Sequence, residues 1–519
     1  MHLFTDTSTN VACARVCKAW QENVLDILWY RIDRLDRLFR LLGPMGEINS
    51  QLVYHISNER WDRFSFYANR ARHLEVTDRL PEIHHQSFST LSIARPVLHL
   101  LPNLTHLTWK KDPARPTSSL VLCLLFLTPG LKSLSVETGH SSEQGDLFAI
   151  DNFFKDVVHR CPRIERLEFR SDILFHDIGP SLSNFLTGFP GLKAVLLSDA
   201  LLTSDVITAL AKCPLLESIR MTDPSETTEV EEETDDLQNY MPVIEDGAFP
   251  SLQEMDIKAH LWNVTSFLQS DIPAARLRRL VVRTLSLEDN ANVAAFFARV
   301  AEACPELEVL ALWIQYGGIE DNSESLPFAS LEPLLRCTSL TAFTLNMPLP
   351  LDIDDAEGTL IASSWPRLRD LHLNPFPAVQ RPAGKHLTFA VLARFAQHCP
   401  QLQALGLYIL SSSISQSTGR KVIPKLKTLV LGLIGTSYIV EDLALFLTDI
   451  SPAKCSITGS PYISIGLQAH IHVAQVKLNK VLTLLPMLRS IHAQYQERLR
   501  VLEAEVQRLS LFAAPVIQL

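Results

Sequence analysis

One short phrase recurs along the chain and strongly limits how it can fold. Its clearest copy is Cys399-Pro400-Gln401-Leu402-Gln403-Ala404-Leu405-Gly406-Leu407, which can be written (Cys)-Pro-x-Leu-x-x-Leu-x-Leu. Copies with and without the proline recur with a period of about 30 residues, the signature of stacked structural repeats. We call the first apolar position of each copy its anchor. The thirteen anchors are Ala71, Leu104, Leu131, Ile164, Leu192, Leu216, Leu252, Leu277, Leu307, Leu340, Leu368, Leu402 and Leu426.

Each copy predicts a unit of helix, turn and short strand. The last two apolar residues of the phrase lie two positions apart, so on an extended strand they point to the same side. Before most copies, apolar residues recur at three- and four-residue steps, as on one face of a helix. The proline cannot continue that helix and marks its end. Helical stretches of this kind cover residues 151–160, 204–212, 293–303 and 387–398.

Units of this kind need neighbours. One helix and one strand cannot bury their apolar faces alone, whereas units stacked side by side form a continuous core. Strands that are joined by helices must run parallel. From Ala71 to about Leu433 the chain therefore resembles leucine-rich repeat proteins of the cysteine-containing type. The resemblance implies an α/β solenoid, with parallel strands inside and helices outside.

The pattern divides the chain into four parts. Residues 1–45 form a helical segment of another kind, and residues 46–101 hold irregular first repeats or a linker. The repeat array spans residues 102–450, and residues 451–519 supply the last strands and a C-terminal helical cap. Within the array, residues 223–246 are rich in Asp and Glu, which predicts a solvated loop. The alternative is a docking loop for a basic partner.

Composition favours a large core and argues against several classes of partner. Apolar residues make up 47% of the 519 residues, and the mean hydropathy is +0.11. A net charge of −10 disfavours nucleic acid and anionic membrane surfaces. The longest apolar run, Leu120 to Leu127, is too short to cross a bilayer, and the N-terminus lacks a signal-peptide pattern. We therefore expect a cytoplasmic or nuclear protein with no membrane partner.

Motifs for catalysis or cofactor binding are missing from the sequence. It contains no phosphate-binding loop, dinucleotide fingerprint, zinc-protease motif or nucleophile elbow. His470-Ile471-His472 would place two imidazoles on one side of a strand, without a third ligand in view. We expect no enzyme activity, no cofactor and no metal. Five cysteines at one repeat position fit a buried packing ladder better than a zinc site, which needs paired ligands: Cys161, Cys213, Cys304, Cys337 and Cys399.

The first 45 residues carry a second recognisable motif. Ala14-Arg15-Val16-Cys17-Lys18-Ala19-Trp20 is followed by the pair Leu28-Trp29, and helical spacing continues until Gly43-Pro44. This pattern resembles the second half of an F-box, and the residues after it are similar to F-box-like proteins of mushroom-forming (basidiomycete) fungi. The Leu-Pro-x-Glu-Ile/Leu segment that opens an F-box does not occur before Asn10.

The resemblance implies a substrate-recognition subunit of a cullin-RING ubiquitin ligase of the SCF type. Val16, Cys17, Trp20, Leu28 and Trp29 would then bind the adaptor protein of the ligase, and the repeats would bind the target protein. The ubiquitin chemistry would belong to other subunits. The alternative is a protein-interaction scaffold with no ligase role, in which the N-terminal helices only cap the array.

The strand residues that alternate with the core positions point away from the core, onto the face where solenoids usually bind partners. They are polar in the early repeats, but small and apolar in the later ones. We expect Val309, Ala342 and Ala404 to form a target-binding patch on this concave face, with Trp313 and Tyr408 as aromatic anchors. The alternative is that residues 348–357 or 375–385 fold back over them.

The chain ends in a different pattern. Between residues 488 and 509, apolar side chains stand mostly at alternating three- and four-residue steps, over less than three heptads. We expect a terminal helix that covers the open end of the array. The alternative is a dimerisation helix.

Overall fold

The computed structural model contains two compact units. Unit 1 comprises Met1–Lys258 and Ser270–Pro273, and unit 2 comprises Ala259–Gln269 and Ala274–Leu519. The structure describes all residues except 1–10, 14, 16–17, 49–50, 78–82, 111–115, 139–143, 172–174, 223–239, 270–273, 285–286, 315–323, 379–383, 411–421, 435–437, 460–468 and 513–519. Most of the acidic stretch 223–246 therefore lies outside the described residues.

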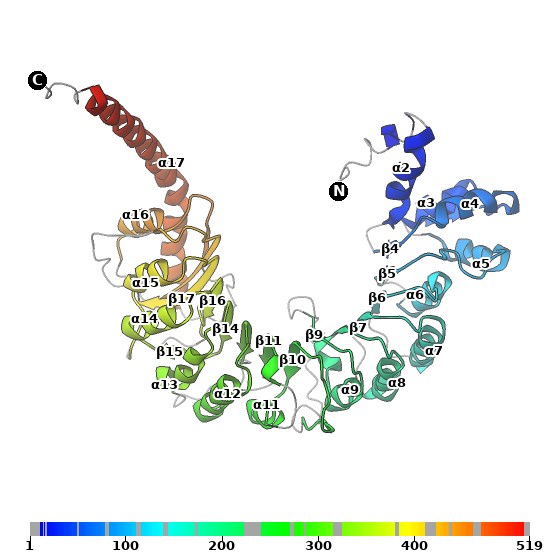
Figure 1. Ribbon diagram of the computed structural model, residues 1–519, viewed down its shortest axis with the longest axis horizontal. Coiled ribbons are helices and arrows are strands. Elements are labelled where there is room, and N and C mark those ends of the chain that lie inside the picture. The colour runs from blue at the N-terminus through cyan, green and yellow to red at the C-terminus, as the bar shows by residue number, and fades with distance from the viewer. Residues whose placement is uncertain are drawn as a thin grey trace, which may run out of the picture. The chain divides into compact units, whose positions relative to one another are not determined.

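Unit 1 is a parallel sheet with helices on one side (Figure 1). Its strands lie in the order β1 (Arg31–Ile32), β4 (His73–Val76), β5 (His106–Trp109), β6 (Ser133–Thr138), β7 (Arg166–Ser171), β8 (Ala194–Leu197), β9 (Ser218–Met221) and β10 (Glu254–Lys258). A separate hairpin pairs β2 (Met45–Ile48) with β3 (Gln51–Tyr54). The helices are α2 (Lys18–Tyr30), α3 (Leu35–Leu42), α4 (Trp61–Ala68), α5 (His85–Ala94), α6 (Pro116–Cys123), α7 (Gln144–Arg160), α8 (Phe175–Thr187) and α9 (Ser204–Leu210), with short 3-10 turns η1 (Asn58–Arg60), η2 (Leu124–Phe126) and η3 (Asp199–Leu201).

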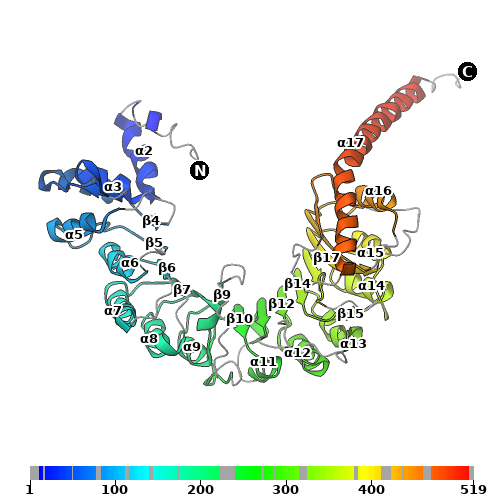
Figure 2. The ribbon, with the colours of Figure 1, turned by 180° about the vertical axis from the view of Figure 1, so that it is seen from behind.

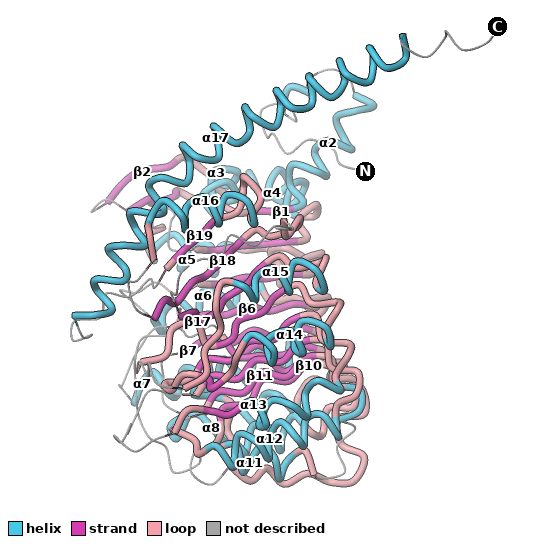
Figure 3. The backbone as a smooth tube through the Cα atoms, turned by 90° about the vertical axis from the view of Figure 1, so that its left-hand side faces the viewer, coloured by secondary structure: helices cyan, strands magenta, loops and turns pink. Residues whose placement is uncertain are grey.

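Unit 2 repeats this architecture, as the reverse view in Figure 2 and the side view in Figure 3 show. Its parallel strands are β11 (Arg279–Arg283), β12 (Val309–Trp313), β14 (Ala342–Asn346), β16 (Asp370–Leu373), β17 (Ala404–Leu410), β18 (Thr428–Ile434) and β19 (Ser456–Thr458), and β13 (Leu326–Pro327) pairs with β15 (Leu351–Asp352). The helices are α11 (Leu261–Phe267), α12 (Asn290–Ala303), α13 (Phe328–Leu331), α14 (Asp355–Ser364), α15 (Ala390–His398), α16 (Val440–Ile450) and α17 (Ala469–Phe512), with η5 (Ala274–Arg276) and η6 (Glu332–Arg336).

The repeated phrase positions every strand that it predicts. A strand begins two residues after each of the thirteen anchors, and the strands of the repeat sheet in each unit are parallel. The apolar residues of neighbouring copies pair across the sheet: Leu134 lies opposite Leu167 in unit 1, and Leu310 opposite Phe343 in unit 2. All four side chains are at most 3% exposed. The predicted α/β solenoid of leucine-rich repeat type is therefore confirmed.

The cysteine position lies where each helix ends. Cys304, Cys337 and Cys399 cap α12, η6 and α15, and the Cys399 thiol donates a hydrogen bond to the carbonyl oxygen of Ala362, 3.3 Å away, on the preceding helix. Burial raises the pKa of Cys161, Cys304 and Cys399 to about 12, so these thiols stay protonated at neutral pH. Metal binding needs the thiolate. Among the described residues, no three His, Cys, Asp or Glu side chains lie close enough together to hold a metal ion.

Both ends of the chain extend the repeat sheets beyond the thirteen strands that follow the anchors. In unit 1, β1 interrupts the helical segment that the sequence predicts up to Gly43 and pairs with β4, Ile32 lying opposite Leu74. Helix α3 then ends at Leu42, as Gly43-Pro44 predicts. In unit 2, β19 is one of the last strands expected between residues 451 and 519, and it pairs with β18. Residues 470–472 lie in helix α17 and not in a strand, so the proposed pair of imidazoles on one side of a strand was wrong.

Helix α17 covers the last repeat only with its first part. Leu478, Val481 and Leu485 are at most 3% exposed and pack towards α16, whereas most of the apolar residues from 488 to 509 are exposed. The expectation that residues 488–509 cover the open end was therefore wrong, because residues 478–485 already complete that core. Of the helices that the structure describes, none is both long enough and apolar enough to cross a membrane.

Candidate protein-binding surfaces

The side of each sheet that carries no helices is called its open face. In unit 2, the first residues of the strands form one row on this face, in which Val309 lies opposite Ala342 and Asp370 lies between Ala342 and Ala404. These side chains are half-buried. The predicted small residues therefore share one row, which is interrupted by a single carboxylate.

A second row runs beside the first and is also mostly small and neutral. It contains Ala311, Thr344, His372, Gly406 and Val430, on consecutive strands of the sheet. The ring of His372 leans over Gly406, where a Cβ atom would lie 2.3 Å from Nδ1 of that ring. Burial lowers the pKa of His372, although Asp370 acts in the opposite direction. The imidazole is therefore neutral at pH 7, and the row presents no charge.

Trp313 stands at the end of β12, in a third row on the open face. It lies opposite Arg283 on one side and Asn346 on the other. Its backbone oxygen accepts a hydrogen bond from the amide of Thr284 at 2.9 Å, which fixes the strand at this point. The side chain is 37% exposed. Trp313 is thus an exposed aromatic side chain on a fixed strand, where a partner can contact it.

Tyr408 has different surroundings from Trp313. It lies on β17, which is separated from β12 by β14 and β16, and its register partner is Gly432. A Cβ atom on Gly432 would lie 1.7 Å from the carbonyl oxygen of Pro375, so the segment after β16 crosses the sheet here. Burial raises the pKa of Tyr408, which keeps its hydroxyl protonated. The segment after β16 therefore covers the predicted target-binding patch at Tyr408, whereas the patch is exposed to solvent at Trp313.

The open face of unit 1 is polar. The rings of His73 and His106 are stacked with centroids 4.0 Å apart, and the Tyr30 hydroxyl lies 3.3 Å from Nε2 of His73. Burial lowers the pKa of both histidines, and neighbouring cationic groups add to the effect, so both are neutral at pH 7. Arg31 forms an ion pair with Glu75 on the same face. The small, apolar pattern of unit 2 is not repeated here.

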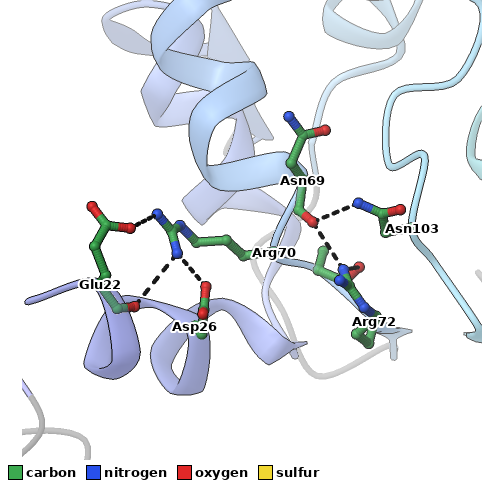
Figure 4. A network of polar contacts seen from close by, with 7 residues as sticks. Glu22, Asp26, Asn69, Arg70, Arg72 and Asn103 are labelled. Atoms are coloured by element: carbon green, nitrogen blue, oxygen red, sulfur yellow. Dashed lines mark hydrogen bonds and ion pairs between the residues drawn. The ribbon is translucent and has the colours of Figure 1, made fainter.

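Arg70 ties helix α2 to the repeat that follows α4. Arg70, just after α4, forms ion pairs with Glu22 and Asp26 of α2 (Figure 4). Burial lowers the pKa of Arg70, but its hydrogen bonds to these carboxylates more than offset this, and the net shift is upward. Beside it, the backbone oxygen of Asn69 accepts hydrogen bonds from Asn103 and Arg72, at 2.8 Å each. The backbone around Asn69 and Arg70, to which α2 is attached, is therefore held in place by hydrogen bonds.

The predicted adaptor-binding residues of α2 fall into two groups. Trp29 packs inward: its ring centroid lies 4.7 Å from that of Tyr67, and the Arg37 guanidinium lies 5.0 Å above the ring. Leu28 is half-buried. Trp20, in contrast, is 56% exposed. Val16 and Cys17 lie outside the described residues. Among the motif residues that the structure describes, Trp20 is thus exposed to solvent, and Trp29 supports the fold.

Sequence reasoning missed two features of these surfaces. Arg70 gives no motif signal, because its partners are more than forty residues away in the sequence. The crossing of Pro375 over the sheet is indicated in the sequence by Gly432, which interrupts a run of strand-forming residues. Glycine within a strand often marks the close approach of another backbone.

No family model matches the chain, and no curated protein matches it by sequence. Comparison with solved structures gives distant similarities. The Rad7 and Elc1 complex in yeast matches with a TM-score of 0.37 at 14% identity, over 83% of this chain and 96% of that chain. The leucine-rich repeat-containing protein LegL7 from Legionella pneumophila has a TM-score of 0.31 at 13% identity, over 57% of this chain and 91% of that one. A protein from Bacteroides fragilis has a TM-score of 0.30 at 11% identity, over 66% and 79%.

Proposed function

We propose that the chain is a non-enzymatic protein-interaction scaffold of the cytoplasm or nucleus, whose open face in unit 2 binds a protein partner. The observation that carries this proposal is the combination of small residues in two rows with the part-exposed Trp313 beside them. Small side chains let a partner approach the sheet closely. An exposed tryptophan beside them supplies the kind of aromatic anchor that dominates binding energy at protein interfaces.

The dimensions of this face favour a protein over a small molecule. The two rows run across β12, β14, β16, β17 and β18. At about 4.8 Å between neighbouring strands, they extend over about 19 Å. A partner that covers such a width contacts many residues weakly and a few strongly, as in protein–protein interfaces.

Photo-cross-linking tests this proposal. A photoreactive amino acid in place of Ala404 is expected to form a discrete covalent adduct with a partner protein in the cells that produce the chain. The matched control carries the same group in place of Leu360, which is 50% exposed on helix α14, on the helix-covered side. Equal adducts from both positions, or none from position 404, would overturn the proposal.

A more specific form of the function is favoured by helix α2. We propose that α2 binds the adaptor of a cullin-RING ubiquitin ligase, so that the chain is the substrate-recognition subunit. The supporting observations are the F-box-like residues of this segment, the exposure of Trp20 and the ion pairs through which Arg70 holds the helix. A helix fixed at its base loses little conformational entropy when a partner binds it.

Trp20→Ala is expected to weaken binding to the purified adaptor at least tenfold, because exposed tryptophans at interfaces commonly contribute about 2 kcal/mol or more. The fold is expected to stay intact, since Trp20 is 56% exposed. Calorimetric titration measures the affinity, and circular dichroism checks the fold. Trp262→Ala, at a tryptophan that is 46% exposed in unit 2, is the control and is expected to bind like the wild type. A wild-type chain that does not bind the adaptor would leave only the scaffold function.

A further inference from the structure

The second part of helix α17 carries apolar side chains that the repeats do not cover. Arg489 ties the helix to the last repeat: it donates hydrogen bonds to the carbonyl oxygens of Ala453 and Cys455 and to Ser451 Oγ, at 3.2, 3.0 and 2.9 Å. Beyond it the helix continues to Phe512, clear of α16 (Figure 1). The exposed fractions of its apolar side chains are 64% for Tyr495, 49% for Leu499, 58% for Leu502, 66% for Val506 and 58% for Leu509. We call these five residues the α17 stripe.

The spacing of the α17 stripe is that of a coiled coil. Its members are separated by four, three, four and three residues, and Leu488 and His492 continue the alternation backwards to the point where the helix leaves the repeats. Counted from His492, this alternation occupies the a and d positions of three successive heptads, and His492 is the one member of those six that is not apolar or aromatic. A strict a/d pattern is the narrow seam of a helix that pairs with another helix, whereas a helix that lies on a globular core has a wider apolar face.

We propose that the α17 stripe pairs with the same stripe of a second copy of this chain. The charges beside the stripe suit a like partner. In a parallel pair, Arg498 at position g faces Glu503 at position e of the second copy, and the symmetric contact forms as well. In an antiparallel pair, Arg498 faces Glu505 of the second copy. Both arrangements place opposite charges together.

The overall charge of this segment is also compatible with self-association. From Tyr495 to Leu509 the helix carries three arginines, Arg498, Arg500 and Arg508, and three glutamates, Glu497, Glu503 and Glu505. A second copy is therefore not repelled, and pairing buries apolar surface that is otherwise left in water. The inference does not depend on the proposed partner or adaptor binding, because the α17 stripe lies on neither of those surfaces.

Sedimentation of the full chain tests the pairing with two neighbouring substitutions. Leu502 and Val501 are both 58% exposed, but only Leu502 belongs to the α17 stripe. The wild type and Val501→Asp are expected to be dimers at micromolar concentration. Leu502→Asp is expected to be a monomer, with a dissociation constant raised at least about a hundredfold, because it places a carboxylate in the seam. Equal melting temperatures of the repeats in both variants would exclude a folding defect.

Charge reversal provides an independent test of the proposed pairing. Arg498→Glu is expected to weaken the dimer, and a second substitution is expected to restore it: Glu503→Arg for a parallel pair, or Glu505→Arg for an antiparallel pair. A monomeric wild type, equal effects of Val501→Asp and Leu502→Asp, or failure of both rescues would overturn the proposal. So would a wild type that stays monomeric and instead binds a different protein through the stripe.

Discussion

Trp365→Ala is expected to lower the free energy of unfolding of unit 2 by about 3–5 kcal/mol, the usual cost of truncating a buried aromatic residue. Trp365 stands at the repeat position that cysteine occupies in other copies, directly before Pro366. It is 0% exposed, and its ring meets Phe343 edge-on with centroids 5.4 Å apart. Its indole nitrogen also donates to the carbonyl oxygen of Leu334 at 3.3 Å. The substitution therefore opens a cavity and removes one of the two hydrogen bonds that the carbonyl oxygen of Leu334 accepts, the other coming from the Cys337 amide.

Amide hydrogen exchange in β14 and β16 measures this effect locally, which suits a repeat array because neighbouring repeats supply most of each other's stability. The control is Trp262→Ala, which removes the same side chain from a site that is 46% exposed, and it is expected to cost less than about 1 kcal/mol. Similar losses in the two variants would contradict the assignment of Trp365 to the inter-repeat core.

Gly432→Ala is expected to destabilise the last repeats by about 1–3 kcal/mol, as over-packing of a tight interior does. The added Cβ atom would lie 1.7 Å from the carbonyl oxygen of Pro375 and 2.8 Å from the ring of Tyr408. A backbone carbonyl cannot turn aside as the end of a long side chain can. The segment after β16 must therefore lift from the sheet, which is also expected to expose Tyr408.

Two readouts separate this movement from general unfolding. Exchange of the Asn374 amide, which donates to the carbonyl oxygen of Leu345 at 2.8 Å, is expected to accelerate, while amides of β11 and β12 keep their wild-type rates. Gly191→Ala is the control, because a Cβ atom there meets nothing within 4 Å. Unchanged exchange at Asn374 would show that Pro375 does not rest on Gly432.

The repeat fold was predictable because its information is local and periodic. Each anchor is followed at a fixed distance by a strand, and Leu134, Leu167 and Leu310 face the core as the two-residue alternation requires. Strand β1 was missed for the opposite reason. Arg31–Ile32 is only two residues long and follows a helical pattern, and its strand conformation depends on pairing with β4 some forty residues later.

The candidate surfaces were predictable only in part. Register follows from the repeat, so the row that contains Val309, Ala342 and Ala404 could be derived. The solvent exposure of these side chains could not be derived from the repeat, because it depends on segments that are distant in sequence. Pro375 lies against Gly432 beside Tyr408, whereas Trp313 stays 37% exposed. In the same way, the F-box-like pattern includes both Trp20 and Trp29, but the sequence alone does not show that Trp29 packs against Tyr67.

The central claim is that the open face of unit 2 binds a protein through Trp313. Its most direct test is the affinity of the partner that is cross-linked at position 404, titrated against the wild type, Trp313→Ala and Trp262→Ala. We expect Trp313→Ala to bind at least tenfold more weakly, and Trp262→Ala to match the wild type, since only Trp313 lies on the open face. Equal affinities of the wild type and Trp313→Ala would contradict the claim.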